Sequence, residues 1–359
     1  MSDILEQFDG LLKEDGPAAI IIKQWLKPVG SNVICPPTYA NSEKEEKRAV
    51  YNVDRFSDGT SSCVIDSIPS QANRIEPIFA RIEKGKLVPQ IAIAVKSKRG
   101  DISVDFLDVG HRAADAIVRF SSIASKIAEA IDAYERHDSW PLAKLAPTSL
   151  VFGLWDSRRK PTVKIPRLIN SIIRAFNVRE YSRKAQYVSS LRDFEAAGVL
   201  RDKGDKELSE VGMADVPAPE GLGGVEALGG ICRDASLNLC TLRDITSKNK
   251  SQTQALQRYI LGLSLVAMTY FDGKTLNLRQ GCQLVAMPEK PMSRMLMDSD
   301  GTETTFEITR ESAIAYAAAV AETFGVGPDH MDVQFNAKTA KDSLKKDKGS
   351  VAPGETVKA

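Results

Sequence analysis

The chain has 359 residues, of which 43% are hydrophobic and 26% charged, a composition typical of a globular protein with a substantial core. Its 48 Lys and Arg are almost balanced by 47 Asp and Glu, which excludes a protein coated uniformly with positive charge. The five cysteines include no CxxC pair, which argues against a zinc module and against a disulfide framework. Because the charges of the whole chain nearly cancel, any strongly basic surface must be local.

In chain order, hydrophobic periodicity predicts a mixture of helices and strands. Helices are predicted at 4–12, 77–84, 111–120, 123–134, 253–271 and 309–324. Strands are predicted at 18–26, 91–95 and 150–155, together with a hairpin arm at 276–287. Residues 70–76 are interpreted as a polar lead-in to the helix that starts at Pro77. Because strands and helices do not alternate strictly, the pattern favours an α+β fold.

The boundaries of the chain give further expectations. The N-terminus has no basic segment followed by a long apolar core, so no signal peptide is predicted. The most apolar stretch, 260–271, is shorter than the roughly 20 residues that span a bilayer. We therefore expect a cytoplasmic protein with no membrane segment. One domain is predicted at 1–335, with a projecting insertion at about 156–215 and a disordered tail at 336–359.

The strongest local signal is a basic run from Arg158 to Lys184. It contains nine basic residues and a single acidic residue, Glu180. The basic residues are Arg158, Arg159, Lys160, Lys164, Arg167, Arg174, Arg179, Arg183 and Lys184. Trp155, Tyr181 and Tyr187 lie within or beside the run and offer rings for base stacking. The segregated charge indicates contact with nucleic acid, whereas docking of an acidic protein is the main alternative.

Other motifs carry weaker signals. The segment 70–76 is rich in hydrogen-bonding side chains, which is typical either of sugar and phosphate contacts or of a capped helix start. His111 and Asp115 share a face if they lie on a helix, as an oriented base or as an ordinary surface pair. The segment Gly273–Thr275 lacks the first glycine of a P-loop, since position 268 is Met268, so no phosphate loop is predicted.

Taken together, these segments resemble a known family. Over roughly residues 15–325 the chain resembles the backbone protein of type I-G (earlier I-U) CRISPR interference complexes, a Cas-seven type member of the RAMP superfamily. The resemblance is carried by five motifs and the basic segment with Arg167, in this order: Pro-Pro-Thr-Tyr at 36–39, Asp66-Ser67 with Ser-Gln-Ala-Asn-Arg-Ile-Glu at 70–76, His-Arg-Ala-Ala-Asp at 111–115, Pro-Thr-Ser-Leu-Val-Phe-Gly-Leu-Trp-Asp-Ser at 147–157, and Gly229-Gly230.

The resemblance implies an RRM-like (ferredoxin-like) palm with an inserted basic thumb-like segment and additional helices. Copies of such subunits stack along the guide RNA (crRNA) and present it to target DNA. It also implies that Glu76 and Asp115 hold neighbouring cations in place. The residues expected to line the guide groove are Lys23, Gln71, Asn73, Arg74, His111, Arg112, Arg158, Arg159, Lys164 and Arg167.

The resemblance further implies a non-catalytic subunit without cofactor or metal. Its expected partners are crRNA, target DNA through guide pairing, further copies of itself and other CRISPR effector subunits. Two alternatives stay open. Related subunits cut target RNA with an acidic loop residue, for which Asp54, Asp58 and Asp66 are the candidates here. The other alternative is a protein–protein adaptor whose basic segment docks an acidic partner.

Overall fold

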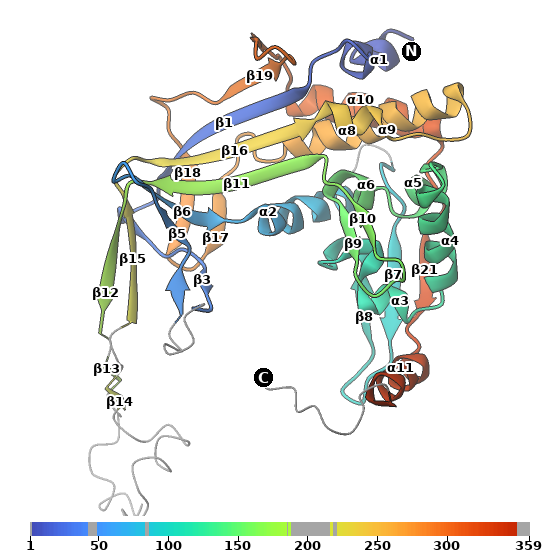
Figure 1. Ribbon diagram of the computed structural model, residues 1–359, viewed down its shortest axis with the longest axis horizontal. Coiled ribbons are helices and arrows are strands. Elements are labelled where there is room, and N and C mark those ends of the chain that lie inside the picture. The colour runs from blue at the N-terminus through green and yellow to red at the C-terminus, as the bar shows by residue number, and fades with distance from the viewer. Residues whose placement is uncertain are drawn as a thin grey trace, which may run out of the picture.

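The protein is built on one large curled antiparallel sheet with helices packed against it (Figure 1). The computed structural model describes residues 2–41, 49–82, 86–184, 186–187, 216–217 and 221–349. Within this part of the chain the fold is a mixed α+β fold, as the sequence predicted. No helix among these residues is both long and apolar enough to cross a membrane.

The large sheet has the strand order β17-β18-β1-β16-β11-β6-β5, and β19 also pairs with β1 and with β20. These strands are β17 (Leu276–Arg279), β18 (Cys282–Ala286), β1 (Ala19–Pro28), β16 (Ile231–Asn238), β11 (Ile169–Phe176), β6 (Ser61–Asp66), β5 (Val53–Arg55), β19 (Ser293–Met297) and β20 (Glu303–Thr305). All of these pairings are antiparallel.

Smaller sheets extend from this platform. One contains β21 (His330–Gln334), β7 (Ile91–Val95) and β8 (Ile102–Asp105), and another contains β12 (Val178–Arg183), β15 (Gly221–Ala227) and β2 (Val33–Ile34). The two-stranded pairs are β9 (Leu154–Asp156) with β10 (Val163–Ile165), β3 (Thr38–Tyr39) with β4 (Val50–Tyr51), and β13 (Gln186–Tyr187) with β14 (Val216–Pro217).

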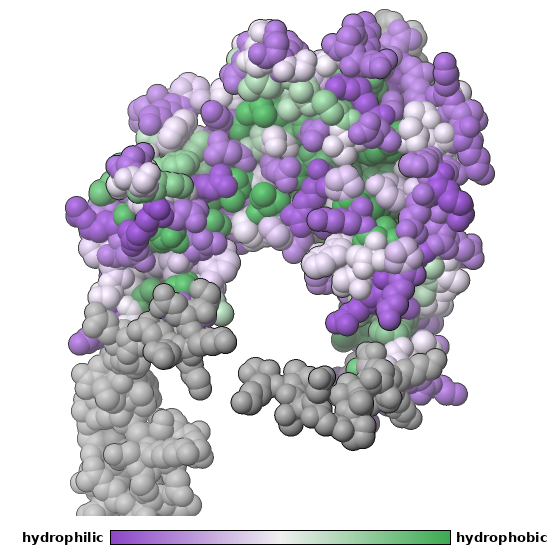
Figure 2. Space-filling view, viewed as in Figure 1, coloured by the Kyte–Doolittle hydropathy of each residue, from purple (hydrophilic) through white to green (hydrophobic). Residues whose placement is uncertain are grey.

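The helices form a separate set of elements. The α-helices are α1 (Ser2–Glu6), α2 (Ile68–Ile75), α3 (Ala116–Arg119), α4 (Ala124–Glu135), α5 (Trp140–Leu145), α6 (Thr148–Phe152), α8 (Leu239–Arg243), α9 (Lys250–Met268), α10 (Arg310–Phe324) and α11 (Ala337–Gly349). The 3₁₀ turns are η1 (Asp9–Leu12), η2 (Glu76–Ala80), η3 (Phe106–Asp108) and η4 (Arg112–Ala114). Figure 2 shows a surface hollowed between two projections, the β12–β15 arm and the lobe that contains β7, β8 and α4.

The two faces of the large sheet differ. Ser171 of β11 and Arg233 of β16 are fully buried, and both lie on the face that packs against α2 and the end of α9. Lys23 of β1 pairs with Asp234 of β16, so its side chain lies on the opposite face of the sheet from Arg233, and it is exposed. The alternating pattern of β11 therefore separates a helix-covered face from an open one.

Several predicted elements are confirmed. The predicted strands at 18–26 and 91–95 are β1 and β7, and the hairpin arm at 276–287 is β17–β18. The predicted helices at 253–271 and 309–324 are α9 and α10. Thr309 caps α10 in a capping box with Ser312, and Gly325 ends this helix with a left-handed φ of 69°. These segments have strong periodicity and clear caps, which are the signals that sequence reasoning uses best.

The predicted projecting insertion at 156–215 is wrong for residues 169–176. Its residues 169–176 form β11, a strand in the interior of the large sheet that pairs with both β16 and β6. The arm starts only with β12, and the residues from 188 to 215 lie outside the described part. Charge misled the prediction, because Asn170 and Arg174 of β11 occupy the open face while the alternate residues are buried.

Three local predictions also differ from the structure. Residues 148–152 are helical rather than extended, so the predicted strand at 150–155 is reduced to β9. The polar segment 70–76 is helix α2 itself rather than a lead-in, and Pro77 marks the change to a 3₁₀ turn because it cannot donate a backbone hydrogen bond. Residues 337–349 form α11 where a disordered tail was predicted; Asn336 accepts a bond from the backbone of Thr339 and caps its start.

Candidate nucleic-acid interface

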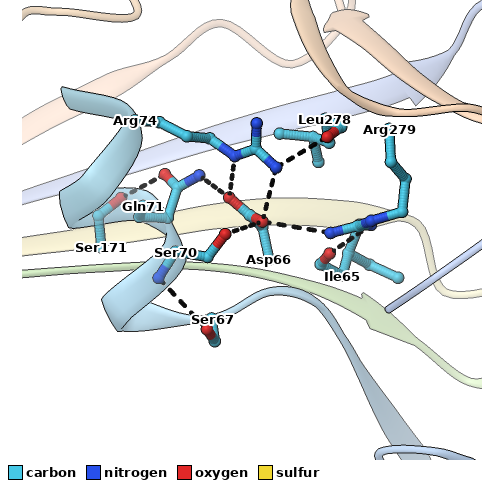
Figure 3. Close-up of polar contacts among 9 residues, drawn as sticks. All are labelled: Ile65, Asp66, Ser67, Ser70, Gln71, Arg74, Ser171, Leu278 and Arg279. Atoms are coloured by element: carbon cyan, nitrogen blue, oxygen red, sulfur yellow. Dashed lines mark hydrogen bonds and ion pairs between the residues drawn. The ribbon is translucent and has the colours of Figure 1, made fainter. Parts of the chain in front are cut away.

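A buried carboxylate, Asp66, fixes helix α2 (Figure 3). Asp66 ends β6, is fully buried, and accepts hydrogen bonds from Ser70 (2.8 Å) and from the amide of Gln71. The guanidinium of Arg74 donates to it from the next turn at 3.0 Å. Because three side chains of one helix meet one carboxylate, the helix is held in a single register. Ser67 caps the same helix by accepting from the backbone of Ser70.

A second cation completes this cluster from a distant part of the chain. Arg279 of β17 donates to Asp66 at 3.3 Å and to the carbonyl of Ile65 at 2.9 Å. Arg74 also donates to the carbonyl of Leu278 at 2.8 Å. The cluster therefore ties β6, α2 and β17 together. Sequence reasoning missed Arg279, because nothing in the sequence pairs it with a residue 213 positions away.

The predicted residues on α2 have different exposures. Gln71 is fully buried and accepts a hydrogen bond from the hydroxyl of Ser171 at 2.9 Å. Its side chain therefore does not reach the surface, contrary to the prediction that it lines a groove. Arg74 is partly exposed, and its guanidinium is already paired with Asp66. Asn73 is exposed, and its amide lies beside Gly110. Of the three predicted site residues on α2, Asn73 is thus the one whose side chain is exposed.

The loop beyond Gly110 contains the next predicted residues. His111 is exposed, whereas Arg112 is buried and forms an ion pair with Glu76 at 2.8 Å. The backbone φ of Arg112 is +51°, a left-handed conformation that a residue other than glycine rarely adopts. Arg112 is therefore a structural anchor, and the prediction that its side chain lines a groove is wrong. The prediction that Glu76 holds a cation is confirmed.

Asp115 has a different role from the predicted one. Its carboxylate caps α3 by accepting from the backbone of Ile117 at 3.1 Å, and it also accepts from the backbone of His111 at 3.4 Å. It therefore contacts backbone rather than a cation. Since His111 precedes η4 instead of lying on a helix, the predicted shared helical face does not form.

Burial raises the pKa of Glu76 to about 7, although the neighbouring Arg112 guanidinium opposes this shift. The side chain is 1% exposed, so water cannot stabilise its charge. The pKa of Glu76 therefore lies near neutral pH, and its carboxyl is paired with Arg112, the residue that follows His111.

The backbone of Gly153 lies in contact both with this loop and with the basic run. Arg112 donates to the carbonyl of Gly153 at 3.3 Å. A Cβ atom added to Gly153 would lie 2.6 Å from Cγ of Arg167, and the φ of Gly153 is +79°. Glycine is required here on both grounds. Arg167 and Arg112 therefore both pack against Gly153. Burial lowers the pKa of Arg167, and the charge of Arg112 lowers it further.

An exposed aromatic ring stands on the adjoining hairpin. Trp155 of β9 is 66% exposed and pairs across the hairpin with Lys164 of β10, which is also exposed. Arg158 follows in the turn and is exposed, and η4 packs against β9. An uncovered indole beside flexible cations is the arrangement that stacks a base and neutralises its phosphate.

The other predicted cations do not all share this surface. Arg159 is partly buried and forms ion pairs with Asp132 and Glu135 of α4, so its charge is compensated. Lys23 is exposed on the open face of the large sheet, away from the face that carries α2. Arg174 lies on that open face as well, and Arg179 pairs with Glu226 on the arm at 3.8 Å. The basic run is thus divided among three surfaces.

The three aspartates considered for nuclease chemistry differ in their burial. Asp66 is fully buried and occupied by its cluster, whereas Asp54 and Asp58 are exposed. Thr60 donates to Asp58 through both its backbone and its hydroxyl, which lowers the pKa of this carboxyl. Within the described residues no group of three or more His, Cys, Asp or Glu is placed to hold a metal ion.

Comparisons with known proteins place the chain. A search of curated protein sequences finds no match. A solved chain titled "CRISPR RNA-guided surveillance complex, pre-nicking" superimposes with a TM-score of 0.33 at 12% identity, covering 92% of this chain and 99% of that one. Residues 20–180, which contain α2, the His111 loop and the Trp155 hairpin, match the model of the family described as CRISPR-associated protein GSU0053. Over these residues, the chain is similar to this CRISPR-associated family.

Proposed function

We propose that the protein is a non-catalytic, guide-RNA-binding backbone subunit of a CRISPR type I interference complex, which presents crRNA for pairing with target DNA. The observation that carries this proposal is the exposed Trp155 beside Lys164 and Arg158 on the β9–β10 hairpin. His111 and Asn73 continue this surface, and we name the five residues the Trp155 surface. It combines one stacking ring with charged and polar groups. Such a surface suits a guide of variable sequence.

The strand order supports an RRM-like palm. Along the chain, the strands β1, β11, β16 and β18 come in that sequence, while in space the order is β18-β1-β16-β11. Helices α2 to α6 lie between the first two strands, and α9 lies between the last two. This order matches the one expected of the βαββαβ arrangement of ferredoxin-like folds, and so supports the proposed palm. The resulting open sheet face carries Lys23, which we assign to a second contact with nucleic acid.

Substitutions on the Trp155 surface test the proposal. Trp155→Ala should weaken binding of a 30-nucleotide single-stranded RNA by about tenfold, because base stacking contributes roughly 1–3 kcal/mol. Trp155→Phe should retain most of the affinity, because a ring remains. Lys164→Glu should weaken binding and flatten its salt dependence, because a phosphate contact is lost. Fluorescence anisotropy across a salt series measures each effect.

The matched control for Lys164→Glu is Lys250→Glu, a charge reversal at an exposed lysine at the start of α9. It should leave the affinity within about twofold, since a distant charge is largely screened at about 0.15 M salt. Equal affinities of the wild type, Trp155→Ala and Lys164→Glu would sink the proposal. Cleavage of a labelled complementary RNA in Mg²⁺, abolished by Asp54→Ala or Asp58→Ala, would instead favour the nuclease.

A further inference from the structure

A cleft of about 770 Å³ opens between α2, η2, the end of α9, β17 and the start of α10. Its volume lies within the range of pockets that bind small molecules. Apolar side chains form much of its wall: Pro77, Ile78, Ile82, Phe271, Leu276 and Ile314. Of the five residues of the Trp155 surface only Asn73 lines this cleft, so the two adjoin but are otherwise formed by different residues.

Four cations line this cleft, of which Arg74 is already paired with Asp66. The other three are Arg81 from the end of η2, Lys274 from the turn after α9, and Arg310 from the first turn of α10. Burial lowers the pKa of Lys274, and the charges of Arg310 and Arg81 lower it further. Among the described residues, no ion pair joins any of the three to a carboxylate. Glu311 is the single acidic residue of the lining, so the cleft carries a positive charge that its own side chains do not balance.

The cleft also offers groups that recognise a flat polar ring. Tyr270 presents its ring in the lining, and the ammonium of Lys274 lies 3.8 Å from the centroid of this ring. Asn73 and Asn277 are exposed and contribute amides that donate and accept hydrogen bonds. Cations, an aromatic wall and paired amides match the phosphate, the ring and the polar edge of a nucleotide.

We infer that this cleft binds a phosphate-bearing nucleotide. A phosphate supplies the negative charge that the three cations lack, and a nucleobase fills the apolar volume between Ile78 and Tyr270. An extended acidic peptide fits less well, because addition of a strand to β17 needs the carbonyl of Leu278, which already accepts from Arg74. A free nucleotide supplies the same phosphate and base as a nucleotide of a bound RNA. Such a site therefore goes beyond the proposed function, which concerns the guide RNA alone.

Calorimetric titration of the RNA-free protein tests the inference with three probes: AMP, adenosine and inorganic phosphate. AMP should bind more tightly than either part alone, because the ring and the phosphate contribute together. Lys274→Met combined with Arg310→Gln should weaken AMP binding by at least about tenfold, since two charge-assisted contacts are lost. Lys250→Met, on the same helix as the cleft but at its far end, should bind AMP like the wild type.

Thermal unfolding of each variant establishes that it is folded before titration. Absence of AMP binding to the folded wild type overturns the inference, as does AMP binding that the double substitution leaves unchanged. Binding of an Asp- and Glu-rich peptide at the cleft, without AMP binding, replaces the nucleotide by a protein ligand and also overturns it. These outcomes are independent of Trp155→Ala, so failure here is distinguishable from failure of the guide-RNA proposal.

A photo-reactive phenylalanine at position 275 separates the two sources of nucleotide. Thr275 is exposed in the cleft lining, so the probe faces the bound ligand. A cross-link to a bound single-stranded RNA, suppressed by excess AMP, identifies a nucleotide of that RNA as the occupant. Retained AMP binding with no cross-link to RNA identifies a free nucleotide. Both results support the cleft as a nucleotide site.

Discussion

Glu76 and Arg112 form a pair whose burial makes its protonation sensitive to pH. The folded-state pKa of Glu76 is raised to about 7, above its ordinary value of 4.5. Between these two values the folded chain holds a proton that the unfolded chain has lost. Stability should therefore fall as the pH rises from about 5 to 7, by up to about 1.4 kcal/mol per pH unit.

Urea unfolding of the wild type and Glu76→Gln at several pH values between about 5 and 8 measures this effect. The glutamine amide cannot titrate, so the variant should lose this component of the slope. Glu129→Gln, on the surface of α4, is the control and should keep the wild-type slope. Identical slopes for the wild type and Glu76→Gln would show that Arg112 keeps the carboxylate charged throughout.

At the residue level, the predicted site residues include both exposed and buried side chains, a difference that the sequence did not indicate. Asn73, His111, Arg158 and Lys164 are exposed, and their contact with RNA stays a prediction. Gln71 and Arg112 belong to the same polar motifs but are buried. A sequence pattern states that a side chain is polar, and only tertiary packing decides whether its hydrogen bonds go to a partner or to the protein.

At the scale of elements, Gly153 connects α6 to β9, the first strand of the β9–β10 hairpin that carries Trp155. Gly153→Ala should destabilise the protein by about 2–4 kcal/mol. The new Cβ meets Arg167 and the carbonyl of Ile165, and the backbone has a positive φ. Gly59→Ala is the matched control, because its φ is +82° and nothing lies within 4 Å of the added Cβ.

Urea unfolding of both variants separates backbone strain from steric overlap. Gly59→Ala should cost about 1 kcal/mol, since it carries the strain of a positive φ alone. The excess cost of Gly153→Ala is then the cost of displacing Arg167 and β10. Equal costs for the two variants would mean that the contact between Gly153 and Arg167 tolerates a methyl group.

Elements with complete local signals were predicted well from the sequence, and elements defined by distant pairing were not. Helix α10 has its cap, its periodicity and its terminal glycine within a single segment. Strand β11 obtains its place from β16 and β6, and its basic neighbours in the sequence indicated a projection instead. The pairs that close the Asp66 cluster are likewise far apart in the chain, so only the fold brings them together.

For the whole molecule, near-neutral net charge has a consequence for assembly. Copies with 48 basic and 47 acidic residues repel one another little, so they can pack side by side on one RNA. On the guide-RNA proposal, the number of bound copies should rise stepwise as the RNA is lengthened. Native mass spectrometry of complexes on RNAs of 12, 24 and 36 nucleotides counts the copies.

Trp155→Ala, assayed in the same way, should reduce the number of bound copies at a fixed protein concentration. A single copy on every RNA length would exclude a repeated backbone subunit. Assembly that persists after ribonuclease treatment and without bound RNA would favour the protein–protein adaptor. The same experiment therefore separates the two non-enzymatic functions.

The positive φ of Arg112 limits which amino acids this position can accept. Glycine or asparagine would relieve the backbone strain, but each would leave the buried carboxyl of Glu76 without its guanidinium. Lysine would keep the charge but lose the planar group that reaches both Glu76 and the carbonyl of Gly153. None of these replacements for Arg112 keeps both its charge and its contacts in the loop that carries His111. Saturation mutagenesis should therefore find position 112 among the positions of the chain that tolerate the fewest substitutions.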